Sequence, residues 1–176
     1  MRSKNILRAL IFAAGALFLI FSQNHSAQVG LTVFHFVTVA LAVGGIALAF
    51  ATKEKFNISK LFTPEGVSLV LGITLLALVG GTAMYAEQQL VYLKTFIALF
   101  AFGVAATELN LSRTAKKEDV LELRISSALG ILTGLVFALT PLNALNAVGL
   151  FSAYLALSAV QRAVWAATPN KQEKKN

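Results

Sequence analysis

The sequence contains no cysteine and few of the other side chains from which enzymes build reactive centres. Its 176 residues include two His and a single Asp, at position 119. Without cysteine there is no disulfide, thiol nucleophile or Cys-based metal site, and the redox compartment cannot be inferred. His25 and His35 do not have a metal-ligand spacing. The sequence also has no phosphate-binding glycine loop, nucleophile elbow or paired intramembrane carboxylate. We therefore expect no enzymatic activity and no cofactor.

Charged residues are also scarce, at 13% of the chain, whereas 57% of the residues are hydrophobic. A soluble domain of this size cannot bury so much apolar surface, but lipid can, and each helical span needs about 20 apolar residues. Runs of this length without strict alternation favour helices over a β-barrel. The sequence predicts an all-α membrane protein with six transmembrane helices, at Ile6–Ser22, Leu31–Ala51, Val67–Ala86, Leu90–Leu109, Val120–Thr140 and Leu145–Ala166.

The six spans form three copies of one pattern. Gly15, Gly72 and Gly130 lie near the middle of the first span of each copy, and Gly45 and Gly103 lie near the end of the second, at an interval of about 58 residues. Because each copy holds two spans, all copies enter the membrane in the same orientation, which excludes the simplest inverted repeat. We predict one integral membrane domain over 1–176, with three tandem helical hairpins (parallel repeats) at about 6–51, 67–109 and 120–166.

Small residues favour a closely packed bundle over one that encloses a central cavity. Helices in lipid associate through close packing at small side chains. In the fifth span, Ser126, Gly130 and Gly134 recur every fourth residue and form one smooth stripe. We expect this stripe to pack inside the bundle. The alternative is an interface with a second copy of the chain or with another membrane protein. The other packing candidates are Gly15, Gly45, Gly72 and Gly103.

The basic residues predict which way the chain crosses the membrane. All but Lys94 of the 15 Lys and Arg residues fall on one side, in the termini, in the loops or near the ends of the spans on that side. The positive-inside rule places that side in the cytoplasm. We expect a multi-pass protein of the cell (inner or plasma) membrane with both termini cytoplasmic and a flexible tail at 168–176. These short loops account for the net charge of +7, so we expect the lipid bilayer, and not nucleic acid, as the partner.

Two polar residues are expected inside the spans near the outer face. Lys94 lies about four residues into its span, and His35 lies at a similar depth in the second span. The long stem of Lys94 can reach the outer headgroups, and the alternative is a role in a cavity or an anion path. His35, or His25 in the outer turn, can sense external acid because histidine titrates near pH 6.5. The alternative is a histidine that is hydrogen-bonded to a neighbouring helix or to water.

Acidic and basic residues also gather near the expected inner face. Such charges more often fix helix packing than carry out chemistry, because pairing offsets the cost of burial. We expect an ion-paired ring that joins the hairpins, although the sequence does not indicate which residues pair. The candidates are Arg8, Glu65, Glu108, Glu122, Arg124 and Arg162.

The glycine pattern resembles that of a known family. The stretches are Ala14-Gly15-Ala16-Leu17 with Gly44-Gly45-Ile46-Ala47, Leu71-Gly72-Ile73-Thr74 with Phe102-Gly103-Val104-Ala105, and Leu129-Gly130-Ile131-Leu132 with Leu157-Ser158-Ala159-Val160. With six short-looped spans, this pattern resembles the HdeD-like family of small bacterial inner-membrane proteins over about residues 7–166. The resemblance implies a role in acid resistance at high cell density, and it implies no catalytic residues.

Three functions are compatible with the sequence. The first is a non-enzymatic, HdeD-like membrane protein that supports envelope stress or acid tolerance by packing in the membrane or contacting partners. The second is a small transporter or channel with a path between the hairpins and with His35 and Lys94 at its outer mouth. The third is an accessory subunit of a larger membrane complex. A polar, water-accessible cavity favours the second function, and small-residue stripes that face outward favour the third.

Overall fold

The computed structural model describes residues 2–51, 66–68, 70–71 and 86–168 of the chain. Within these ranges the ordered elements are α-helices: α1 (Arg2–Phe21), α2 (Ala27–Ala51), α4 (Ala86–Ser112), α5 (Lys117–Leu139) and α6 (Ala144–Ala167). The described residues between Gly66 and Leu71 are also helical. Most of the third expected span, including Gly72, and the tail beyond Thr168 lie outside the described residues.

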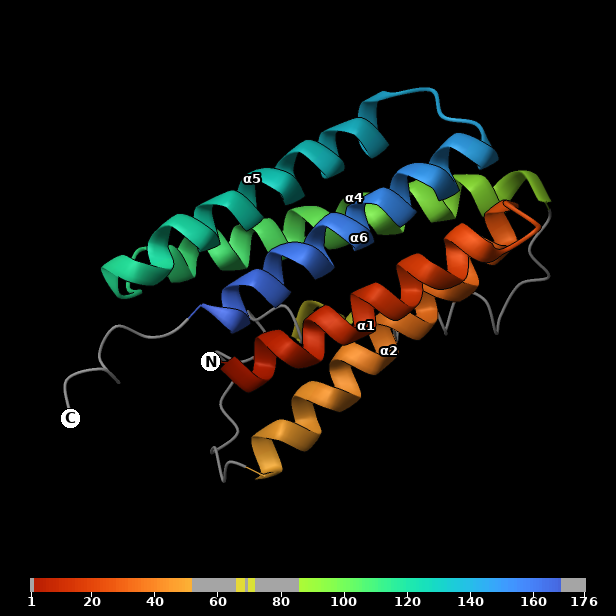
Figure 1. Cartoon of the computed structure of the whole chain (residues 1–176). Coiled ribbons are helices and arrows are strands. Elements are labelled where there is room, and N and C mark those ends of the chain that lie inside the picture. The colour runs from red at the N-terminus through yellow and green to blue at the C-terminus, as the bar shows by residue number, and fades with distance from the viewer. Residues whose placement is uncertain (1, 52–65, 69, 72–85, 169–176) are drawn as a thin grey trace, which may run out of the picture.

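The helices lie side by side as a bundle of alternating direction (Figure 1). Helices α1 and α5 begin at one end of the bundle, where α2, α4 and α6 end. We call this the basal end, and the opposite end the distal end. The most extensive contacts join α4 to α5 and α1 to α6, and α2, α4 and α6 also contact one another. Adjacency in sequence is therefore a poor guide to contact in space: α4 and α5 are consecutive and pack closely, but α5 contacts the next helix, α6, far less, and α1 contacts α6 more than it contacts α2.

Aromatic rings fill the place where α2, α4 and α6 meet. The ring of Phe34 lies 5.8 Å from that of Phe100, 6.0 Å from that of Phe96 and 6.0 Å from that of Phe151, measured between centroids. Phe12 of α1 extends this group by an edge contact with Phe100 at 6.5 Å. All five rings are buried. Aromatic pairs of this geometry add to the stability gained from burial, so this cluster is the centre of the core.

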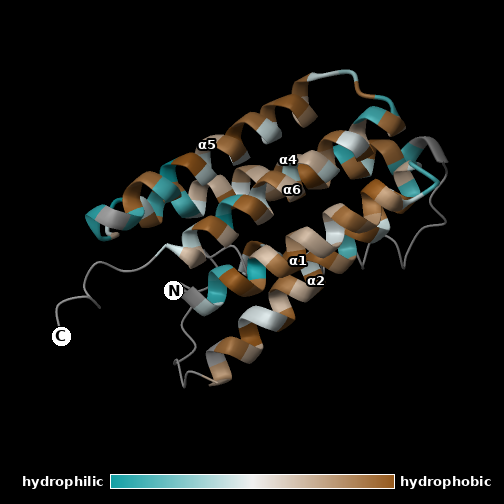
Figure 2. Ribbon diagram, viewed as in Figure 1, coloured by the Kyte–Doolittle hydropathy of each residue, from teal (hydrophilic) through white to brown (hydrophobic). Residues whose placement is uncertain are grey.

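The outer surface of the bundle is largely apolar. Large hydrophobic side chains stand exposed along each helix, among them Phe18, Phe36, Leu132 and Leu157. Figure 2 shows hydrophobic residues along the length of the helices and hydrophilic ones mostly toward the two ends of the bundle. All five helices are long and apolar enough to cross a membrane. A helix that is apolar all round lies in a core or in lipid, and the chain is accordingly a multi-pass membrane protein.

Two short segments between the predicted spans at the distal end, 28–30 and 87–89, are helical. Helix α2 begins at Ala27, so Gln28–Gly30 is helical and not part of the loop. The hydroxyl of Ser26 accepts a hydrogen bond from the amide of Val29 at 3.4 Å, which extends the helix start into polar sequence. Likewise, Glu87–Gln89 belongs to the first turn of α4 and does not form a turn. Glu and Gln are strong helix formers, so these positions are compatible with a helix.

Candidate functional site

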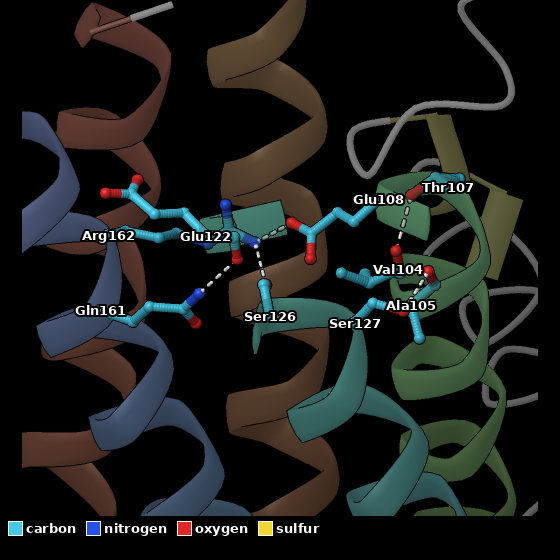
Figure 3. Close-up of polar contacts among 9 residues, drawn as sticks. All are labelled: Val104, Ala105, Thr107, Glu108, Glu122, Ser126, Ser127, Gln161 and Arg162. Carbon is cyan, nitrogen blue, oxygen red and sulfur yellow. Dashed lines mark hydrogen bonds and ion pairs between the residues drawn. The ribbon is translucent and has the colours of Figure 1, made fainter. Parts of the chain in front are cut away.

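A buried ion pair lies near the basal end, between α4 and α6. Nη2 of Arg162 donates to Oε1 of Glu108. The two side chains are only 2% and 1% exposed. Figure 3 shows Arg162 reaching across from α6 to Glu108. Both residues lie about one turn before the ends of their helices. Because an unpaired charge in lipid is costly, each residue stabilises the other at this depth.

Helices α1 and α5 complete the surroundings of the pair. The ring of Phe12, on α1, lies 5.7 Å from Cζ of Arg162, at the distance of a cation–π contact. From α5, the hydroxyl of Ser126 receives a long hydrogen bond of 3.5 Å from Nη2. Four helices therefore meet at one guanidinium group. This explains why Ser126, a member of the small-residue stripe, is polar.

Further polar contacts tie α5 to its neighbours around the pair. Gln161 donates from Nε2 to the carbonyl oxygen of Glu122 at 3.0 Å, and Trp165 donates from Nε1 to Asp119 Oδ1 at 3.4 Å. On the other side of α5, the hydroxyl of Ser127 donates to the carbonyl oxygen of Ala105 at 3.0 Å. Hydrogen bonds between helices contribute to helix association in lipid, and several of them gather here near the basal end.

Several buried polar atoms at this site have no hydrogen-bond partner within the described part of the chain. They are Oε2 of Glu108, Nε and Nη1 of Arg162, Oε2 of Glu122 and Oε1 of Gln161. The Arg162–Glu108 pair uses one nitrogen and one oxygen, although a guanidinium and a carboxylate can form two parallel bonds. The site thus has spare donors and spare acceptors side by side. We define the polar cluster as Glu108, Glu122, Ser126, Gln161 and Arg162.

The structure brings together some of the residues predicted for an inner-face ring and leaves others apart. Glu108, Glu122 and Arg162 belong to the polar cluster, whereas Arg124 is exposed on α5. Arg8 is half-buried on α1 and has an interaction of its own. Glu65 lies outside the described residues. Glu108 and Arg162 thus form a buried ion pair with Glu122 beside it, and a ring through all six residues stays a prediction.

Lys94 lies at the opposite, distal end and binds protein. Its Nζ donates to the carbonyl oxygen of Thr140 at 2.9 Å, at the C-cap of α5. The same oxygen also accepts a hydrogen bond from the backbone amide of Leu142 at 2.9 Å, and a cation at this position complements the negative end of the helix. The carbonyl of Thr140 gives the ammonium group a partner within the protein, and contact of Lys94 with the outer headgroups stays a prediction.

The two histidines also lie toward the distal end. His35 is half-buried on α2, and its buried Nδ1 has no hydrogen-bond partner among the described residues. His25 is half-buried in the loop between α1 and α2. Among the described residues, no group of three or more His, Asp or Glu side chains is placed to bind a metal ion.

The glycines of the small-residue pattern lie at close helix contacts. A Cβ atom at Gly130 would lie 2.8 Å from the carbonyl oxygen of Ala101, and one at Gly134 would lie 2.7 Å from the ring of Phe102. The stripe on α5 therefore packs against α4 inside the bundle. Gly103 packs in the same way against Val67, and Gly15 against Val37. Gly45 is half-buried.

Sequence reasoning missed three features of these sites. Gly44, and not only its neighbour Gly45, makes a close contact: a Cβ there would lie 2.7 Å from Cδ2 of Leu7. The ring of Phe12, one of many Phe residues in the apolar runs, covers Arg162, and nothing in the sequence pattern distinguishes it. Gln161 was not selected, although a Gln-Arg dipeptide inside an apolar span is itself a signal of a polar site.

Comparisons with known proteins do not identify the chain further. No family model, no curated protein and no solved structure matches it.

Proposed function

We propose that the chain is a non-enzymatic protein of the cell membrane that supports tolerance of acid or envelope stress as a packed helical bundle, in the manner of the HdeD-like proteins it resembles. The observation that carries the packed-bundle part is the aromatic core. Phe34 lies within about 6 Å of three other rings where α2, α4 and α6 meet. A path through the centre of the bundle would have to pass through this position, which the rings occupy. The stress role itself rests on the sequence resemblance.

A threefold arrangement of hairpins accounts for the helix contacts. In the three-repeat scheme, α1 and α5 are first helices, and α2, α4 and α6 are second helices. Each of the two extensive contacts, α4 with α5 and α6 with α1, joins a second helix to the first helix of the next repeat in cyclic order. The second helices contact one another at the centre. Both observations are expected if three hairpins surround one axis, with second helices inside and first helices outside.

The helix directions support a sixth span. Helix α2 ends at the basal end and α4 begins at the distal end (Figure 1), and described residues between Gly66 and Leu71 are helical. The chain returns from the basal end to the distal end between α2 and α4, as a sixth span would require. With six spans, both termini share the basal side, and the basic residues assign that side to the cytoplasm.

Reporter fusions test this topology. We expect a fusion after Asn176 and a fusion at the α4–α5 turn, at Arg113, to report the cytoplasm. We expect a fusion at Asn143, between α5 and α6, to report the outside. A terminal fusion that reports the outside of the cell would overturn the six-span topology.

The stress role is tested by survival of cells that lack the gene. We expect the deletion strain to survive a low-pH challenge less well than the parent, and a plasmid copy of the chain to restore survival. A matched plasmid with the core variant Phe34→Ala, which we expect to fold poorly, serves as the control. Equal survival of deletion and parent strains under acid and under other envelope stresses would contradict the proposal.

A transporter or channel is the second candidate, and the polar cluster favours it over a wholly inert bundle. Ion flux into vesicles that contain the purified protein separates the two. The packed bundle predicts flux no greater than that of empty vesicles.

Mass spectrometry of the intact complex, extracted in mild detergent, then distinguishes a lone chain or homo-oligomer from an accessory subunit bound to a membrane-protein partner.

A further inference from the structure

The polar cluster has a hydrogen-bonding capacity that protein groups leave unused. Nε and Nη1 of Arg162 are free donors, and Oε2 of Glu108 and Oε1 of Gln161 are free acceptors, within the described residues. Arg162 and Glu108 are almost completely buried. Lipid supplies no hydrogen bonds, so buried polar atoms in a membrane protein are satisfied internally or by water.

The mixture of donors and acceptors indicates the chemistry of the missing partner. An anion would satisfy Arg162 but would meet the carboxylates of Glu108 and Glu122. A cation would satisfy those oxygens but would meet the guanidinium. Water both donates and accepts, and it commonly occupies buried sites where it makes about three hydrogen bonds to otherwise unsatisfied groups.

The surroundings indicate from which end water enters. Glu122 and Gln161 are only half-buried, and they lie near the start of α5 and the end of α6, at the basal end. On the inner side, Phe12 covers the guanidinium and in turn contacts Phe100 of the aromatic core. Polar groups thus lead from the basal end to Arg162, and aromatic rings continue from Arg162 toward the middle of the bundle.

We propose that the polar cluster is a water-binding vestibule that opens at the basal end and is closed toward the membrane centre by Phe12. It is a hydrated site within the spanning helices of α4, α5 and α6, with Glu108 and Arg162 at its inner wall. The inference is independent of the stress role, since it rests only on the contacts and burial of these residues.

The absence of native cysteine makes the vestibule testable by thiol labelling in native membranes. We introduce Ser126→Cys into the cluster and, as a matched control at the same depth, Ser127→Cys, whose hydroxyl faces α4. A small, water-soluble, charged methanethiosulfonate reagent reacts with the hydrated thiolate. We expect Ser126→Cys to react on the order of tenfold faster than Ser127→Cys, because only hydrated thiols ionise readily.

Three further variants locate the vestibule. Lys116→Cys, in the exposed α4–α5 turn, reports full access from the basal side. Thr133→Cys, buried farther along α5, reports access beyond the aromatic closure and should remain unlabelled. With the reagent on one side only, Ser126→Cys should react from the side on which Lys116→Cys reacts and not from the other.

Two outcomes would overturn the proposal. One is Ser126→Cys reacting no faster than Ser127→Cys while Lys116→Cys is labelled, which means that the cluster is dry. The other is Thr133→Cys reacting as fast as Ser126→Cys, which means that water penetrates the whole bundle. If Ser126→Cys does not accumulate in the membrane, Gln161→Cys replaces it on α6, with the buried Ser152→Cys as its control, and the same two outcomes decide.

Discussion

At the scale of single residues, the neighbours of Arg162 offset the cost of burying its charge. Arg162 has three kinds of neighbour: the carboxylate of Glu108, the hydroxyl of Ser126 and the ring of Phe12. The carboxylate neutralises its charge, and the ring covers one side of it. A charge that is held in this way depends on its partner, so removal of one member affects stability more than removal of both.

Breaking the pair from one side should be strongly destabilising. We expect Arg162→Leu, which leaves Glu108 buried without its cation, to lower the free energy of unfolding by about 3–5 kcal/mol. The double variant Glu108→Leu/Arg162→Leu should recover most of that loss. Thermal unfolding of the purified protein in detergent measures both, with the exposed Arg124→Leu as control. If the stability losses of Arg162→Leu and Glu108→Leu simply added in the double variant, the two residues would not be a coupled pair.

Lys94 should act locally, at the end of α5. Lys94→Met removes the donor to the carbonyl of Thr140, and we expect a loss of about 1–2 kcal/mol, as for a hydrogen bond to a charged group. Amide hydrogen exchange should become faster in the last turn of α5 and remain unchanged at its start. Lys94→Arg, which keeps a cationic donor, is the matched control. Unchanged exchange in Lys94→Met would show that the cap contributes nothing.

At the scale of helices, glycines decide how closely neighbours approach. Gly130 and Gly134 let α5 lie against α4, whereas Gly149 of α6 has no atom within 4 Å of its missing Cβ. The kind of neighbour matters as much as the distance. At Gly130 it is the backbone oxygen of Ala101, which cannot rotate away, and at Gly44 it is the side chain of Leu7, which can.

A series of Gly→Ala substitutions should follow this order. We expect Gly130→Ala to destabilise by about 1–3 kcal/mol, because α5 must move away from α4. Gly44→Ala should cost less than that, because Leu7 can change rotamer. Gly149→Ala should be neutral or should stabilise by up to about 1 kcal/mol through helix propensity. Unfolding of the three variants under identical detergent conditions gives the ranking. If Gly149→Ala lost as much stability as Gly130→Ala, the contact with α4 would not be the cause of the loss at Gly130.

At the scale of the whole molecule, the bundle has an aromatic centre, a polar basal end and an apolar outer surface. Phe34 joins α2 to both α4 and α6, so it links helices that are far apart in sequence. Phe36, two residues later on the same helix, is 68% exposed and faces outward. These two residues have the same chemistry and nearly the same depth, and they differ in what surrounds them.

The pair Phe34 and Phe36 therefore tests the packed centre. We expect Phe34→Ala to destabilise by about 3–5 kcal/mol, the range for a buried ring removed from a core. Phe36→Ala should change stability by less than about 0.5 kcal/mol, as for a surface position. Unfolding in lipid nanodiscs measures both while keeping the outer surface covered. Comparable losses in the two variants would mean that the centre of the bundle is no better packed than its lipid-facing surface.

Much of the helical organisation could be predicted from local sequence. The described helices contain nearly all of the five corresponding spans and differ at the ends, where Ser26 and Glu87 extend helices into polar sequence. The candidate charged residues could also be named, because a charge in an apolar run is conspicuous. Which charges meet could not be predicted. Glu108 and Arg162 pair because α4 and α6 are neighbours, and sequence order does not reveal this.

By itself, the sequence determined that this chain forms long apolar helices for a membrane, because each run has the length and composition that hydrocarbon requires. Only the tertiary structure decided that α1 packs on α6 and α4 on α5. It likewise decided that Lys94 caps a helix, that Phe12 covers Arg162 and that Gly130 lies against α4. The physical reason is that burial and helix formation depend on local composition, whereas these contacts depend on which helix faces are brought together.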